Sequence, residues 1–436
     1  MIIEEEKKFM AHKLERFSNY KNYLYLLSDF IVRGVTLLSL PLFLKFMSVE
    51  EYGLFSLYQS IAGFTIIFLS FNLSSSIIKI QLNRNYNLQS IKNAINLSLV
   101  FTIVLFVLSF SIYFMGYIHS NTLFTIILIL LYSLFTSIIF IELENLRSKE
   151  KVGKYCIISV SYAFVTTIMG FISILYFPGD SAVLRFISLA TITAIVGVTI
   201  LIRYNSKISG PFIERNLLKD MLFTAIPLLP FTLASTMLIH INKIVLGFIS
   251  IEHIGYYTFA ANIALLIYII SLSLNKAIQV KMMQSLKENK LPNKELLVNF
   301  TLFYISYLIM IIFTKQLIVI FGNQNYLSVE ITVKILVLGY GFAYFFAILS
   351  NILYYFGDSM VLGKISLIGA IVLFILDITL IPKYGLNGAA FAVLLTYLYM
   401  FLHSYKYIFE HYKYIKFQFR IVIIYLIAIV LPFFVT

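Results

Sequence analysis

Charge and cysteine are scarce in this sequence, and tryptophan is absent. Charged residues are 12% of the 436 residues, about half the share of a typical soluble domain. The single cysteine, Cys156, excludes an intramolecular disulfide and a cysteine metal cluster. No Walker lysine loop and no HExxH motif occur, so we expect no direct use of ATP, no metal and no other cofactor.

Long polar connections are lacking as well. No stretch between the apolar runs is long enough for an extramembrane catalytic domain, so we expect that the chain is not an enzyme. Residues 1–22 are charged and lack the short apolar core and cleavage site of a signal peptide. The first apolar span is therefore expected to serve as an uncleaved insertion signal.

Apolar residues dominate instead, at 60% of the chain and a mean hydropathy of +0.92. Four runs, 93–118, 155–179, 254–275 and 335–357, contain no Asp, Glu, Lys or Arg. A helix needs about 20 apolar residues to cross the hydrocarbon core, whereas barrel strands are about 10 residues long and alternate in polarity. The sequence therefore predicts an all-α polytopic membrane protein. The predicted spans are 23–47, 53–78, 93–118, 121–141, 155–177, 181–202, 220–249, 254–275, 296–321, 328–356, 360–382 and 385–405.

Basic residues set the predicted orientation. If the N-terminus is cytoplasmic, most of the 33 Lys and Arg residues fall in the N-terminal segment, alternate connections and the C-terminal tail, as the positive-inside rule requires. The net charge of +13 is then a topology signal, and we expect no nucleic-acid partner. The last apolar run, 420–436, is just long enough to cross, and its placement stays open.

The second half of the chain repeats the first. Three similar elements recur in the same order at offsets of 202 to 204 residues. They are FMSVEEYGLFS (46–56) with FISIEHIGYYT (248–258), LSFN (69–72) with LSLN (272–275), and Pro178 with Pro382. An even number of spans in each half gives both halves one orientation, with a pseudo-two-fold along the membrane normal and a central cavity. The predicted parts are a cytoplasmic segment 1–22, a six-helix lobe 23–202, a basic linker 203–219, a six-helix lobe 220–405 and a tail 406–436.

The repeated stretches carry a family resemblance. Residues 34–60, 242–264 and 376–397 look like the O-antigen or capsule repeat-unit flippases (Wzx-type) of the MATE-like (MOP) exporter superfamily. The last stretch is the most specific, with Ile-Pro-Lys-Tyr-Gly followed by a small-residue patch. The resemblance implies twelve core spans in the bacterial cytoplasmic (inner) membrane, alternating access, and transport of an undecaprenyl-diphosphate-linked oligosaccharide to the outer leaflet. It also implies contact with membrane lipids, and with a polysaccharide polymerase and chain-length partners.

Polar residues within the spans are the candidates for binding substrate. Arg33 lies near the middle of the first span, and Lys243 lies about 9 Å from the end of the seventh by helical rise. Either cation suits a diphosphate or an acidic sugar, although Arg33 could instead bridge two helices and Lys243 could reach the interface. Asn242 precedes Lys243, where the family often has an acidic residue. Asn72 and Asn275 hold equivalent positions and could bind sugar hydroxyls or join helices.

Asp377 and His240 are the candidates for ion coupling. Asp377 lies about five residues from the end of the eleventh span, where the family often has Asn, and could bind a proton or sodium or pair with a cation. His240 lies one turn from Lys243 and could take part in proton coupling or simply pack.

Three other functions stay open. A cation-coupled multidrug exporter of the same superfamily should prefer acidic cavity residues, and this chain offers more basic ones. A membrane glycan polymerase or ligase usually needs a sizeable outer loop. A flippase for the cell-wall precursor would belong to a family with about fourteen spans, more than we predict here.

Overall fold

The protein is built from helices. The computed structural model describes residues 24–25, 27–77, 88–177, 179–207 and 210–412, and every regular element within them is helical. Of its helical segments, 11 are long and apolar enough to cross a membrane, beginning with Leu27–Phe46. The labelled elements are α2 (Leu40–Phe46), α3 (Val49–Ser70), α5 (Leu88–Phe114), α6 (Ser120–Ser148), α7 (Val152–Tyr176), α8 (Ser181–Lys207), α9 (Arg215–Ala225), η1 (Ile226–Leu228), α10 (Leu229–Gly247), α11 (Ile251–Leu286), α12 (Asn293–Ile312), α13 (Thr314–Phe321), η2 (Gln324–Val329), α14 (Glu330–Tyr355) and α15 (Ser359–His411). The predicted fold class, an all-α polytopic membrane protein, is confirmed. The run 420–436 lies outside the described residues.

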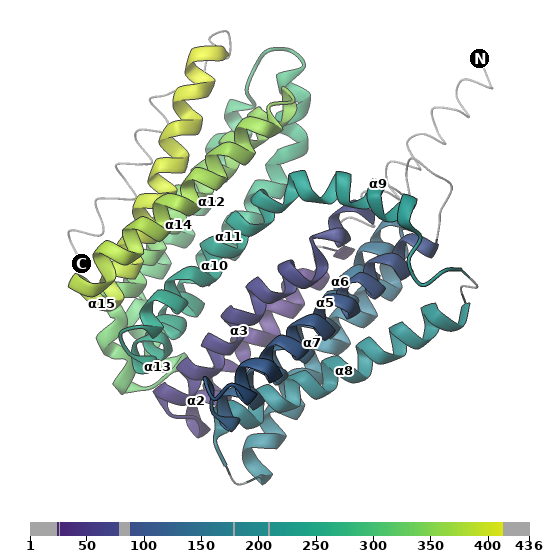
Figure 1. Cartoon of the computed structure of the whole chain (residues 1–436). Helices are drawn as coiled ribbons and strands as arrows, with labels where there is room; N and C mark the ends of the chain where they lie inside the picture. Colours follow the sequence, from purple (N-terminus) through teal and green to yellow (C-terminus); the bar gives the residue numbers. More distant parts are fainter. Residues whose placement is uncertain (1–23, 26, 78–87, 178, 208–209, 413–436) are drawn as a thin grey trace. The chain divides into compact units, whose positions relative to one another are not determined.

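The 53-residue helix α15 is a hairpin (Figure 1). A straight helix of this length would be about 80 Å long, far more than the roughly 30 Å of a bilayer core. The helix is interrupted at Gly385, whose φ of 54° and ψ of −127° are not helical. A Cβ on Gly388 would lie 2.3 Å from the Leu380 carbonyl oxygen, so the two arms, before and after Gly385, are in close contact near the break. Counted separately, these arms turn the 11 candidate spans into the predicted twelve.

The chain divides into two compact units. Unit 1 holds Met1–Leu42 and Ile61–Leu229, and unit 2 holds Phe43–Ser60 and Pro230–Thr436. In unit 1, α6 packs on α8, with α5 against α6 and α7 against α8 (Figure 1). Its core is a cluster of buried apolar side chains from α3, the short helix that follows it, α5, α6, α8 and α9. The predicted lobe boundaries stay a prediction.

Polar side chains on α5 hold the segment that leads into α9. The amide of Asn93, fully buried, donates to Glu214 O at 3.0 Å and accepts from Glu214 N at 2.9 Å. Three more side chains of α5 bind successive carbonyls of this segment: Gln89 to Pro211 O at 2.9 Å, Lys92 to Gly210 O at 2.8 Å, and Asn96 to Phe212 O at 2.6 Å. The apolar positions Leu217, Met221 and Ala225 of α9 are buried at helical spacing. The entry to α9 is therefore a fixed part of unit 1.

We expect Asn93→Ala to lower the stability of the protein. The change removes both hydrogen bonds to the partly buried backbone of Glu214. Its C=O still accepts from Leu218 N, but its N–H loses the Asn93 acceptor, which costs about 1–3 kcal/mol. The midpoint of thermal unfolding in nanodiscs should fall by several degrees. It is measured by size-exclusion chromatography of samples heated to a series of temperatures. Asn205→Ala, at an exposed asparagine of α8, is the control and should not shift it. Equal midpoints for the two variants would contradict this role of Asn93.

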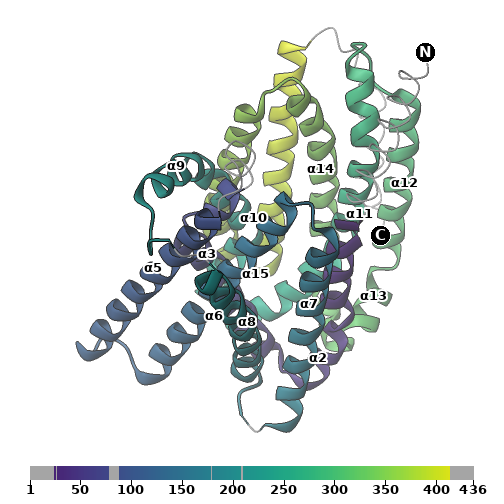
Figure 2. The same cartoon turned by 90° about the vertical axis from the view of Figure 1, so that its right-hand side faces the viewer.

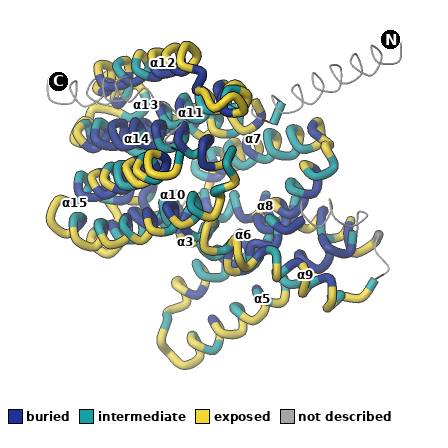
Figure 3. Tube along the Cα trace, turned by 90° about the horizontal axis from the view of Figure 1, so that it is seen from above, coloured by how far each residue is buried: buried dark blue, intermediate teal, exposed yellow. Residues whose placement is uncertain are grey.

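Unit 2 is built around α14. In the span Gln324–Tyr355, which contains α14, 78% of the most apolar 18-residue stretch is buried, against at most 50% in the other candidate spans of the described chain. This helix packs on α11 and on α15 (Figure 2), and it is largely coloured as buried in Figure 3. A Cβ on Gly339 of α14 would lie 3.1 Å from Leu394 Cα, so the absence of a side chain permits a close approach to the second arm of α15.

The internal repeat forms a reciprocal helix crossing within unit 2. A Cβ on Gly53 would lie 2.3 Å from Ile251 O, and a Cβ on Gly255 would lie 2.1 Å from Val49 O. These four residues are two equivalent pairs, each separated by 202 positions. Ser56 and Thr258, another equivalent pair, share a hydrogen bond of 2.8 Å between their hydroxyls. The two repeats thus meet about a local two-fold axis, where a side chain on either glycine would collide with backbone.

The repeat also fixes where both helices start. Ser48 and Glu51 exchange hydrogen bonds with each other's backbone N–H, which is a capping box at the start of α3. Ser250 caps α11 by accepting from Glu252 N. Further along, the halves differ. Asn72 has a φ of 56° just beyond the end of α3, whereas the equivalent Asn275 lies inside the unbroken helix α11.

Candidate functional site

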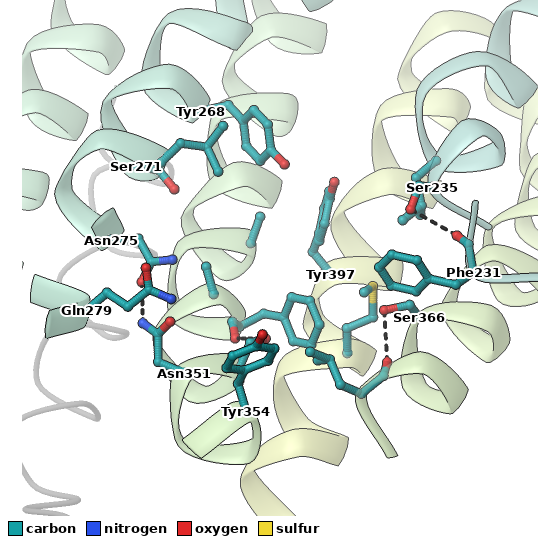
Figure 4. A pocket seen from close by; sticks show the side chains of 18 residues that line it. Phe231, Ser235, Tyr268, Ser271, Asn275, Gln279, Asn351, Tyr354, Ser366 and Tyr397 are labelled. Atoms are coloured by element: carbon teal, nitrogen blue, oxygen red, sulfur yellow. Dashed lines mark hydrogen bonds between the residues drawn. The ribbon is translucent and has the colours of Figure 1, made fainter. Parts of the chain in front are cut away.

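A cavity of about 320 Å³ opens inside unit 2, among α10, α11, α14 and α15 (Figure 4). Its volume falls at the lower end of the range of about 300–1,000 Å³ usual for small-molecule sites. Three groups of side chains line it. Tyr268, Ser271, Leu272, Asn275 and Gln279 come from α11; Ala343, Phe346, Ala347, Ser350, Asn351 and Tyr354 from α14; and Phe231, Ser235, Leu238, Leu362, Ser366, Tyr397 and Met400 from α10 and α15. We call it the amide–tyrosine cavity.

The lining is polar but uncharged. None of the 18 lining side chains is acidic or basic. Three carboxamides gather on one side, where Asn351 Nδ2 donates to Asn275 Oδ1 at 2.7 Å and Gln279 lies beside them (Figure 4). Ser271 is 1% exposed, and its hydroxyl has no hydrogen-bond partner among the described residues. The cavity therefore offers donors and acceptors to a neutral ligand and no counter-charge to an ion.

Helical spacing explains why these residues share one wall. On α11 the lining positions 268, 271, 275 and 279 recur every three or four residues, so they form one stripe. On α14 the positions 347, 351 and 354 do the same. Of the candidates from the sequence, only Asn275 lies in this lining. The helical spacing of these polar residues is visible in the sequence, but candidates chosen one residue at a time do not reveal it.

Asn242 and Asp377, predicted for different roles, form a buried cluster. Asp377 is fully buried, and Asn242 is 1% exposed. Asn242 Nδ2 donates to Asp377 Oδ1 at 3.0 Å and to Ala389 O at 3.3 Å, so one amide joins α10 to both arms of α15. Asp377 Oδ2 has no partner in the described part of the chain. A buried carboxylate with a free oxygen is costly, so this atom is suited to hold a proton or a small cation.

His240 and Lys243 lie on α10 near this cluster in sequence but have other surroundings. His240 Nδ1 lies 3.2 Å from Ser60 Oγ, which itself donates to Ser56 O at 2.8 Å. His240 is thereby connected to the crossing of the repeats, where Thr258 binds Ser56. Lys243 is partly buried and forms no ion pair with Asp377. Pairing of Asp377 with a cation was one alternative left open by the sequence; in this structure its carboxylate accepts from Asn242.

Arg33 and Asn72 belong to unit 1. Arg33 is exposed on the span Leu27–Phe46. Asn72 is 6% exposed, and its carbonyl accepts from both the N–H and the hydroxyl of Ser75. Its Nδ2 has no partner in the described residues. This side chain thus sits in the turn after α3, where its left-handed backbone suits asparagine.

A second buried acid was missed in the sequence. Glu142 of α6 is 1% exposed, one residue beyond the predicted span 121–141. Its carboxylate accepts hydrogen bonds from Tyr204 and Asn145, the latter at 2.9 Å, and pairs with Arg203 at 3.3 Å. With these donors the charge is compensated, so Glu142 links α6 to α8, and both of its carboxylate oxygens have partners, whereas Asp377 has one oxygen without a partner in the described residues. Because Glu142 lies beside a basic connection, the sequence did not indicate that it is a residue within a span.

Comparison with known proteins agrees with this architecture. Residues 21–280, more than half of the chain, match the polysaccharide biosynthesis protein family. An uncharacterized membrane protein of Haemophilus influenzae is 19% identical over 381 residues, which cover 84% of this chain and 93% of that protein.

Solved structures share the fold. The lipid II flippase MurJ, in an inward closed conformation, superposes with a TM-score of 0.70 at 17% identity, over 95% of this chain and 97% of MurJ. An outward-facing multidrug resistance MATE family transporter of the MOP superfamily has a TM-score of 0.55 at 14% identity, over 91% of this chain and 97% of the transporter. At these identities the likeness shows a shared fold.

Proposed function

Because the chain belongs to the polysaccharide biosynthesis protein family, we propose that it is a flippase for a lipid-linked oligosaccharide. The substrate would be a repeat unit of O-antigen, capsule or exopolysaccharide on undecaprenyl diphosphate. It would pass from the inner to the outer leaflet of the cytoplasmic membrane, where a polymerase and its chain-length partners would take it over. The observation that carries the proposal is the family match over residues 21–280, and the whole-chain likeness in fold to a lipid II flippase supports it.

Alternating access would supply the movement. The N-terminus would be cytoplasmic by the distribution of Lys and Arg. The reciprocal crossing at Gly53 and Gly255 would then lie toward the outer leaflet. Arg33 and Lys243 would offset the charge of the diphosphate as it enters, while the lipid tail stays in the bilayer. Asn72 and Asn275 would bind sugar hydroxyls.

An ion gradient would drive the cycle, with Asp377 as the coupling residue. Its carboxyl is fully buried and keeps one oxygen without a partner in the described residues. A proton or sodium ion bound there would remove the cost of a bare charge in this interior. His240, bonded to Ser60, would carry such a change toward the crossing of the repeats.

A multidrug exporter of the same superfamily is the second candidate, since a MATE transporter shares the fold. A site for cationic drugs would use acidic side chains in its lining. The amide–tyrosine cavity has none, which favours a neutral, hydroxyl-rich cargo.

The test is outer-leaflet appearance of a labelled undecaprenyl-diphosphate oligosaccharide in cells without their own flippase. Wild type should restore outer-leaflet labelling with at least one of the glycan repeats tested. Arg33→Ala, present at an equal protein level, should not. Lys45→Ala is the matched control, because Lys45 is an exposed cation in the same span. Failure of wild type with every repeat tested, together with a change in drug resistance, would replace the flippase by the exporter.

A further inference from the structure

We propose that the amide–tyrosine cavity binds one uncharged sugar ring of the transported glycan. This inference rests on the proposed function and names the class of sugar that unit 2 recognises. It places the anionic diphosphate and any acidic sugar outside this cavity.

The lining chemistry carries the argument. Sugar hydroxyls both donate and accept hydrogen bonds, and carboxamides do the same from a single side chain. Asn275, Gln279 and Asn351 provide three such groups on one wall (Figure 4). The partnerless hydroxyl of Ser271 adds a buried group that a ligand would satisfy, since an unmade hydrogen bond at such a site is costly.

Aromatic rings complete the fit. Tyr268, Tyr354 and Tyr397 lie around the same space and come from three different helices (Figure 4). A tyrosine presents an apolar ring face to the C–H face of a sugar and a hydroxyl to its polar edge. The ring of Tyr340 contacts those of Tyr268 and Tyr397, with centroids 5.2 and 6.1 Å away, and this packing restricts the two lining rings.

Charge decides which sugars fit. An acidic sugar or a phosphate in this cavity would lose its water without gaining a cation, because the 18 lining side chains include none. A neutral hexose or N-acetylated sugar pays no such cost. The volume of about 320 Å³ is of the size of a monosaccharide, so the remaining sugars of the repeat unit would lie outside.

Protection of a single thiol tests the site directly. Cys156 is the one cysteine of the chain, so Cys156→Ser gives a cysteine-free background. In it, Ser350→Cys places a thiol in the lining, and Ser206→Cys places a control thiol at an exposed position of α8. Purified protein in nanodiscs, free of maltoside detergent, is treated with a small thiol reagent. The reaction is run without sugar, with methyl glucoside, and with methyl glucuronoside at the same concentration.

The neutral glucoside should slow modification of Ser350→Cys, and the glucuronoside should not. The Ser206→Cys control should react equally in all samples. Adding Asn275→Ala should weaken protection by about tenfold, the equivalent of a lost hydrogen bond. Adding Gln279→Lys should let the glucuronoside protect. No protection by the glucoside, or equal protection by both sugars without Gln279→Lys, would overturn the inference. Because this readout needs no transport, it separates failure of the sugar site from failure of the flippase.

Discussion

Gly255→Ala is expected to abolish transport and to lower the midpoint of thermal unfolding by several degrees. The new methyl group would lie 2.1 Å from the carbonyl oxygen of Val49, which is backbone and has no rotamer to change. The two helices must move apart, and overpacking of this kind costs about 1–3 kcal/mol or more. Gly53→Ala should give the same result, because its methyl would lie 2.3 Å from Ile251 O.

A glycine in open space provides the control. Gly363 lies inside α15, and a methyl group added there would have no atom within 4 Å. Gly363→Ala should therefore keep transport and gain up to about 1 kcal/mol of helix propensity. The double variant of Gly53 and Gly255 should lose less than the sum of the single losses, since one separation of the helices accommodates both methyl groups. A Gly255→Ala protein as stable and active as Gly363→Ala would refute the tight crossing.

Asp377→Asn is expected to reduce transport to the level of cells without the protein while leaving the fold intact. The amide keeps an oxygen to accept from Asn242 but binds neither an exchangeable proton nor a cation. Stability should stay equal or rise, because in the wild type the buried carboxyl has an oxygen without a partner in the described residues, and the neutral amide removes that charge. The measurement is flux into proteoliposomes with and without an imposed proton or sodium gradient, beside thermal unfolding of the same preparations.

Two further variants separate coupling from structure. Asn242→Ala should destabilise the protein, since it removes the donor to both Asp377 and Ala389 and leaves both acceptors buried. Glu288→Gln, at an exposed carboxylate just beyond the end of α11, should change neither flux nor stability. If Asp377→Asn lowers flux only as far as it lowers the amount of folded protein, its role is structural and the ion-coupling proposal falls.

The sequence predicted the number of spans well because lipid dictates it. Apolar length per crossing is set by bilayer thickness, so the predicted boundary between 360–382 and 385–405 coincides with the break at Gly385. The ends of helices were predicted less well. The run 254–275 becomes α11, which continues to Leu286, because hydropathy reports contact with lipid and a helix can continue into water.

The site was harder to predict for a physical reason. Which face of a helix lines a cavity depends on its rotation in the packed unit, and single residues do not reveal that rotation. Asn275 was singled out by its repeat partner Asn72, yet the structure gives the two different backbones. Asn351 and Gln279 had no such partner and became visible only once α11 and α14 were packed together.

The crossing of the two repeats has the form of an isologous interface, the kind that joins identical subunits in a symmetric dimer. In such a dimer Gly53 and Gly255 would be one position of one gene, and a single substitution would place two clashing methyl groups at once. In this chain the two positions are encoded separately. Each half can therefore acquire its own features, such as the carboxyl at Asp377 and the uncharged cavity of unit 2, while the surface on which the halves meet stays shared.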